Sequence, residues 1–380
     1  MVFVLKNTIT YECLLEMAEY SVREIDFSDI DAIDIGDVAN VGDMKKIAKL
    51  FRKTGILIIK NVFSNKRCRR YCDSIIDNLR VLCPSLDPEN TKTWKAENLP
   101  SSPRTGLMQG LVSTLPAVLE IRSHRRTRKI FEVIYSGLRK EHVTEFFTSM
   151  DGINVRPHMA PYQNSKDWAH LDQTIANNPF LCVQGQVVLS DTSACFRASP
   201  RSCQVHTQIL EKFQDKIKSP SDNWFMIPKG EYKYAQELVE SVGGQWQVPI
   251  RALKGSVILW SSSTIHSAMI QQKDVKLYGP QKEDPWVDWR FIVYVCHRPK
   301  EDITTRRKQH AERLQKCLEE SRVTNHWGGR MFPKKPYQRF GSAKEKEETI
   351  EDLTNNPEKV RDLIEVPKAI IKKMQPLITL

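Results

Sequence analysis

No apolar run in this sequence approaches the roughly 20 residues that a membrane-spanning helix needs. The nine cysteines are odd in number and scattered, with no Cys-x-x-Cys pair, which argues against a disulfide framework and a zinc knuckle. The phosphate-binding loop, the dinucleotide-binding glycine fingerprint and the Gly-x-Ser-x-Gly elbow are also absent. These absences exclude the commonest nucleotide-binding and hydrolase classes, and they predict reduced, mostly buried thiols.

The start of the chain lacks the features of an export signal. Residues 1–6 are too short an apolar stretch for a signal peptide, and acidic sequence soon follows them. We therefore expect an intracellular protein, located in the cytoplasm and with no membrane span.

The basic charge is the strongest compositional bias. Lysine and arginine exceed the acidic residues to give a formal net charge of +11, and two runs, residues 66–70 and 122–129, are the densest. Neither run has interleaved aromatic residues, so a solvated helix face is favoured over an anion-binding face. The charge permits an anionic partner, such as nucleic acid, a phosphorylated metabolite or a CoA thioester, without requiring one.

The sequence texture divides the 380 residues into three parts. A single core rarely grows beyond roughly 250–300 residues, so one large domain with extensions is expected. We predict an acidic N-terminal extension over 1–44, a main domain over 45–300, and a basic, helical C-terminal extension over 301–380. Within the main domain the patterns predict helices at 44–53, 64–82 and about 115–150, strands at 56–59, 153–155, 183–189, 257–260 and 291–296, and a helical insertion at 207–242.

His170 and Asp172 form a His-x-Asp pair in the strand-rich part of the main domain. Residues two apart on a strand point to the same face, so both side chains could reach one ion. His266 follows a second apolar strand and could supply another imidazole. Two histidines and one carboxylate on one face of a metal are typical of non-haem Fe(II) sites with open positions.

Zinc is the competing metal, and each of these residues alone is more often an ordinary polar side chain. A catalytic zinc site with two histidines and a carboxylate more often uses a helical His-Glu-x-x-His, which this sequence lacks. The carboxylate of Asp172 also matters, because a small residue there would open a position for halide. Its presence favours oxygen transfer over halogenation.

A further cation strengthens the hypothesis. Arg290 begins the predicted strand downstream of His266, where it could hold a dicarboxylate through paired charge-assisted hydrogen bonds. The 24 residues between them include a turn signal and predict a hairpin insertion at about 273–288.

Together these residues resemble the phytanoyl-CoA dioxygenase family of Fe(II)- and 2-oxoglutarate-dependent oxygenases, over about residues 45–300. The resemblance implies an α+β fold, with a mainly β core of the double-stranded β-helix (jelly-roll, cupin-like) type and flanking helices. It implies that His170, Asp172 and His266 ligate the metal and act in catalysis through it, and that Arg290 binds 2-oxoglutarate. The cofactors implied are Fe(II), 2-oxoglutarate and the co-substrate dioxygen. Trp168, Gln173 and Ser267 are implied as pocket lining.

The function expected on this basis is hydroxylation of a small-molecule substrate, which could be anionic, with release of succinate and CO2. Two alternatives stay open. One is a catalytically silent binding module on the same fold. The other is a nucleic-acid-directed oxygenase, suggested by the basic charge and by the lysine- and arginine-rich region after residue 300.

Overall fold

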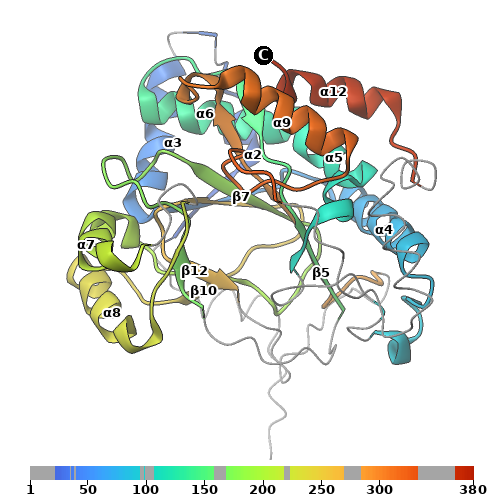
Figure 1. The fold of residues 1–380 in the computed structure, drawn as a ribbon, viewed down its shortest axis with the longest axis horizontal. Helices are drawn as coiled ribbons and strands as arrows, with labels where there is room; N and C mark the ends of the chain where they lie inside the picture. Colours follow the sequence, from blue (N-terminus) through green and yellow to red (C-terminus); the bar gives the residue numbers. More distant parts are fainter. Residues whose placement is uncertain are drawn as a thin grey trace, which may run out of the picture.

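Seven strands form the large mixed sheet at the centre of the protein (Figure 1). The computed structural model describes residues 22–34, 36–37, 40–94, 98, 107–157, 168–217, 223–268, 284–332 and 364–380. In spatial order the strands are β1 (Arg23–Asp26), β2 (Ile56–Lys60), β11 (Val257–Ser261), β7 (Val183–Val188), β13 (Arg290–Val295), β5 (Ile153–Arg156) and β3 (Leu107–Met108). β1 and β2 are parallel, and the other neighbours are antiparallel.

A second, smaller sheet contributes two of the predicted metal ligands. Its antiparallel strands are β10 (Val248–Ile250), β8 (Phe196–Ala198), β12 (His266–Ala268), β6 (His170–Leu171) and β9 (Phe225–Met226). A separate pair joins β14 (His297–Pro299) to β4 (Phe146–Thr148). The α+β class expected from the sequence is therefore confirmed.

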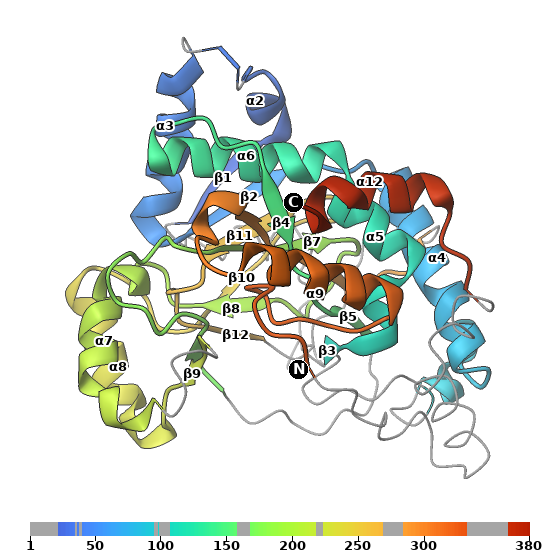
Figure 2. The same ribbon diagram turned by 45° about the horizontal axis from the view of Figure 1, so that its top comes forward.

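Side-chain alternation gives the large sheet two different faces. Leu57, Leu259 and Val293 belong to the main core, which also contains residues of the helices α3 (Val41–Thr54), α4 (Asn65–Leu82), α5 (Pro116–Ser123) and α6 (Arg125–Arg139). These helices cover the side of the large sheet away from the small sheet (Figures 1 and 2). On the opposite face, Ile58 and Ile292 share a cluster with side chains of β8 and β10, so the two sheets pack against each other there.

Two helices of the predicted insertion cover the outer face of the small sheet. They are α7 (His206–Lys212) and α8 (Tyr232–Ser241), and their apolar residues form a cluster with Leu171, Phe225 and Ile265. Because Leu171 is buried on the outer face, its neighbour His170 points the other way, toward the large sheet. The helical insertion therefore fixes the face that His170 presents.

Residues on both sides of the predicted main domain also pack into it. Strand β1 forms an edge of the large sheet, and the short helix α2 (Phe27–Asp31) follows it. Near the other end, α9 (Arg307–Glu319) and α12 (Lys368–Ile378) form a cluster with residues of α5 and β4. The boundaries at 44/45 and 300/301 stay predictions.

The helix predicted at about 115–150 is instead two helices followed by strand β4. His124 ends α5 in an extended conformation, and its Nδ1 accepts a hydrogen bond from the Arg126 amide at the start of α6. Such a side-chain cap starts a new helix, which is why apolar spacing across residues 115–139 could not reveal the break. α6 ends before Lys140, which adopts a left-handed conformation.

The arginine side chains of the basic runs form hydrogen bonds and ion pairs largely with other residues of the chain. Arg122 is fully buried and donates to the carbonyl oxygens of Ser113 and Asp151. Arg125 forms an ion pair with Asp31 at 3.0 Å. Several of these cations therefore hold neighbouring segments together.

Gly55 lies between α3 and β2 and contacts the loop before His266. It ends α3 with a φ of 74°, and a Cβ atom there would lie 2.5 Å from Oγ1 of Thr264, so only glycine fits. Its carbonyl oxygen accepts hydrogen bonds from the Ser261 amide, at 2.8 Å, and from the Thr264 hydroxyl, at 3.2 Å. The glycine that ends α3 thus also positions the loop that leads to His266.

Within the described ranges, no helix is both long and apolar enough to span a lipid bilayer.

Buried His297 gives an expected pH dependence of stability. Burial lowers the pKa of this imidazole to about 3, and the nearby Arg128 charge also lowers it. Between that value and roughly 6.5, the unfolded chain binds a proton that the folded chain does not, so stability falls as the pH falls. We expect His297→Phe to reduce the loss of unfolding free energy between pH 7 and pH 5 by about 2 kcal/mol. Urea unfolding of both proteins at the two pH values measures this, and equal losses would contradict it.

Candidate metal centre

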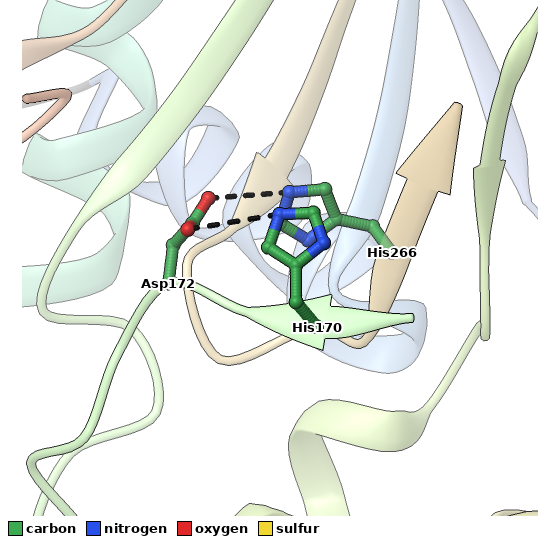
Figure 3. A group of neighbouring side chains, drawn as sticks. All are labelled: His170, Asp172 and His266. Carbon is green, nitrogen blue, oxygen red and sulfur yellow. Dashed lines mark ion pairs between the residues drawn. The ribbon is translucent and has the colours of Figure 1, made fainter. Parts of the chain in front are cut away.

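His170, Asp172 and His266 converge between the two sheets (Figure 3). His170 on β6 and His266 on β12 are direct cross-strand partners, and Asp172 follows immediately after β6. Their candidate ligand atoms all lie within 4.8 Å of one another, and all three residues are buried. Nε2 of His266 is 3.2 Å, and Nε2 of His170 is 3.7 Å, from the carboxylate of Asp172.

Both imidazoles are oriented with Nε2 toward the centre. Nδ1 of His170 donates to the carbonyl oxygen of Trp168 at 3.1 Å, and Nδ1 of His266 donates to that of Thr264 at 2.8 Å. Because a carbonyl oxygen can only accept, Nδ1 of each ring carries a proton, and a ring that binds a metal would do so through the lone pair left when Nε2 gives up its proton. Metal-binding histidines are commonly oriented in this way, by a carbonyl oxygen that accepts a hydrogen bond from the ring nitrogen away from the metal.

The carboxylate of Asp172 is also held in place. Its Oδ2 accepts a hydrogen bond from Nε2 of Gln184 on β7, at 3.0 Å. Burial acts to raise the pKa of Asp172, but the charges of His326 and His170 and the hydrogen bond to His266 outweigh it. The net effect holds the pKa well below its usual value, so the group is a carboxylate ready to bind a cation.

Two residues beyond position 300 hold the backbone of Asp172. Its carbonyl oxygen accepts hydrogen bonds from Nε2 of His326, at 3.1 Å, and from Nε1 of Trp327, at 2.7 Å. The sequence assigned both residues to the basic C-terminal extension over 301–380 and gave them no role. No short motif links them to Asp172, so the sequence offered no signal for this contact.

Trp327→Phe tests the contribution of this support. The substitution removes one hydrogen bond to Asp172 and retains most of the packing, so we expect the affinity for Fe(II) to fall about tenfold, as for other second-shell changes. Anaerobic titration with Fe(II) measures the effect, with the exposed His142→Ala as control. An unchanged dissociation constant would show that His326 suffices.

Arg290 lies on the same cavity as the three candidate ligands. It is the first residue of β13, only 2% exposed, and its Nη1 donates to the carbonyl oxygen of Ala194 at 3.0 Å. Its Nε is buried and has no hydrogen-bond partner among the described residues, so it can donate to an anionic ligand. The hairpin predicted at about 273–288 lies mostly in residues 269–283, outside the described residues.

The cavity has a volume of about 400 Å³ and includes two of the three residues predicted as its lining. Trp168 stacks on the ring of His170, with centroids 4.1 Å apart and planes 9° apart. Ser267 also lines the cavity and donates to Oε1 of Gln247 at 2.6 Å. Gln173 is not among the lining residues, and it is fully buried. Its side chain bonds to the backbone of Ile175 and Asn178 and to the hydroxyl of Ser262.

Sequence comparison identified one distant relative. No family model matches the chain. A curated protein, Ava biosynthesis cluster protein O of Aspergillus versicolor, is 22% identical over 270 residues, which cover 67% of this chain and 77% of that protein.

Comparison with solved structures found one that shares the fold at low sequence identity and another that is more weakly similar. The crystal structure of hypothetical protein JW0805 from Escherichia coli, determined at high pH, aligns with a TM-score of 0.53 and 11% identity, over 90% of this chain and 87% of that chain. The epimerase SnoN, in complex with Fe3+, alpha ketoglutarate and nogalamycin RO, aligns with a TM-score of 0.40 and 12% identity, over 68% and 84%. A likeness as weak as that to SnoN is no evidence of shared chemistry.

Proposed function

We propose that this protein is a non-haem iron dioxygenase that uses 2-oxoglutarate to hydroxylate a small organic molecule. The observation that carries the proposal is the convergence of His170, Asp172 and His266, with both Nε2 atoms directed to one point. Two borderline nitrogen donors and one hard carboxylate on one side of a cavity suit Fe(II) with open positions.

Arg290 supports 2-oxoglutarate as the co-substrate. Its buried guanidinium lines the cavity and has a donor without a partner, which suits the distal carboxylate of a dicarboxylic acid. When bound, iron with 2-oxoglutarate and dioxygen would supply the oxidising power, with succinate and CO2 as products. The chain's own residues would hold 2-oxoglutarate and the substrate in position and would shield the reaction from bulk water.

The two packed sheets support a double-stranded β-helix core of the kind found in phytanoyl-CoA dioxygenase-like enzymes. The ligand pair on adjacent strands of the small sheet and Arg290 on the large sheet fit that arrangement. A small-molecule substrate also fits the biosynthesis cluster in the name of the Aspergillus versicolor relative. A nucleic-acid substrate is less favoured, because Arg122 and Arg125 make their contacts within the chain.

Uncoupled turnover tests the proposal. The full-length protein, supplied with Fe(II), 2-oxoglutarate and oxygen, is expected to release succinate slowly even without its primary substrate. Replacing Fe(II) by Zn(II) should abolish the release, because zinc has no accessible redox chemistry. A protein that binds iron and 2-oxoglutarate but releases no succinate would instead be the catalytically silent binding module.

A further inference from the structure

Four aromatic side chains of the cavity lining form two pairs, one beside each candidate histidine ligand. Phe196 and Trp260 lie 5.6 and 5.5 Å from the ring of His266, and both are buried. Trp168 and Trp224 lie 4.1 and 6.1 Å from the ring of His170. Trp168 is half-buried, and Trp224 is 38% exposed. Of these four rings, the two beside His170 are therefore the ones that a ligand can reach from solvent.

An exposed apolar surface continues from this side of the cavity. Met226 is 44% exposed and is the cross-strand partner of His170, so the two side chains share a face of the small sheet. Trp224, two residues earlier, extends that face. Ile175, 41% exposed, lies nearby, because the Thr174 hydroxyl bonds to Asn223. Neighbouring exposed apolar side chains beside a cavity mark a binding surface.

A positively charged side chain lines another part of the same cavity. Arg330 is exposed, and its guanidinium lies over the ring of Phe332, 5.9 Å from the centroid. The turn that bears it is fixed by the hydrogen bond from the Asn325 amide to the Arg330 carbonyl, 2.9 Å long. Asp172 belongs to the candidate metal centre, which leaves Asp151 as the other acid of the lining. Burial raises the pKa of Asp151, and the charges of His326 and Arg122 act to lower it.

We propose that the primary substrate is an aromatic or polycyclic molecule with an acidic oxygen, its ring against Trp168 and Trp224 and its acidic group at Arg330. The inference rests on the proposed function, since it names the substrate of that same site. Tryptophan faces favour flat rings over flexible chains through stacking. An arginine beside a phenylalanine ring binds an oxyanion by charge-assisted hydrogen bonds. Arg290 is left for 2-oxoglutarate.

Binding of three simple probes tests this class without requiring turnover. The full-length protein is titrated calorimetrically without oxygen, in the presence of Mn(II) and saturating 2-oxoglutarate, with 2-naphthoate, decanoate or 2-naphthalenemethanol. We expect 2-naphthoate to bind about tenfold more tightly than decanoate, which lacks the ring, and than the alcohol, which lacks the charge.

Single substitutions then locate the probe. Trp224→Ala should weaken 2-naphthoate about tenfold, whereas Trp224→Phe retains a ring and most of the affinity. Arg330→Gln should weaken 2-naphthoate by about the same factor and leave 2-naphthalenemethanol unchanged. Val81→Ala and Lys308→Gln are matched controls, because these exposed side chains do not line the cavity.

Several results would overturn the inference. These are equal binding of decanoate and 2-naphthoate, unchanged 2-naphthoate binding in both cavity variants, or no 2-naphthoate binding under saturating 2-oxoglutarate. In the last case a probe that binds when 2-oxoglutarate is omitted occupies the Arg290 end. If 2-naphthoate binds as expected to a protein that takes up neither Mn(II) nor 2-oxoglutarate, the proposed function fails and the ring-binding site stands.

Discussion

His170→Ala is expected to weaken Fe(II) binding by more than about 100-fold and to abolish succinate release. The reason is that a lost ligand costs more than the 10- to 100-fold typical of second-shell changes. The remaining pair, Asp172 and His266, would offer only two donors, 3.2 Å apart. Anaerobic titration with Fe(II) and a succinate assay on the same preparation measure both quantities.

Two comparisons keep this prediction decisive. His142→Ala removes an exposed imidazole elsewhere and should change neither quantity. His170→Asn retains a polar side chain at the strand position, so loss of iron binding in a folded His170→Asn protein assigns the effect to the imidazole. Tight, stoichiometric Fe(II) binding that survives both His170 substitutions would refute the assigned site.

Arg290→Gln is expected to raise the KM for 2-oxoglutarate about 100-fold while the affinity for Fe(II) stays unchanged. Arg290 and Arg330 are the only arginine or lysine side chains among the described residues that line the cavity, and the Nε of Arg290 has no hydrogen-bond partner among the described residues. Charge-assisted hydrogen bonds to a buried carboxylate are worth about 1.5–3 kcal/mol each, and 1.4 kcal/mol corresponds to a factor of ten.

Arg290→Lys is the matched variant. It retains the charge but loses the planar pair of donors, so its KM should lie between those of the parent and Arg290→Gln. Succinate release at varied 2-oxoglutarate concentration gives KM, and anaerobic titration gives iron affinity. An unchanged KM in both variants would remove the anchor assignment and leave the metal site standing.

Local patterns in the sequence predicted the pairing of His170 with Asp172 and some of the elements around the candidate ligands. The His-x-Asp spacing indicated one shared face, and the structure places Nε2 of His170 3.7 Å from Asp172. The strand β11 and the end of the helix α3 before Gly55 could also be predicted, because both depend on residues close together in the chain. The metal-binding role of the three residues stays a prediction.

Other parts of the site had no local signal. Strand β6 has two residues, too few to show a period, and the sequence did not suggest that its histidine would face His266 directly. The family resemblance implied that Gln173 lines the pocket, yet its side chain turns to the loop at Ser262 and Asn178. Adjacency in sequence does not specify direction where a strand ends and a loop begins.

The sequence by itself determined the candidate donor set, the apolar strand that precedes His266 and the presence of a basic residue downstream, since each depends on residue type and short-range spacing. Only the tertiary structure decided that His326 and Trp327, more than 150 positions later, support Asp172. It also decided that exposed Trp224 and Met226 border His170. These contacts arise from sheet pairing and from packing of the segment after residue 300, which join residues far apart in the chain, and no periodicity encodes such pairings.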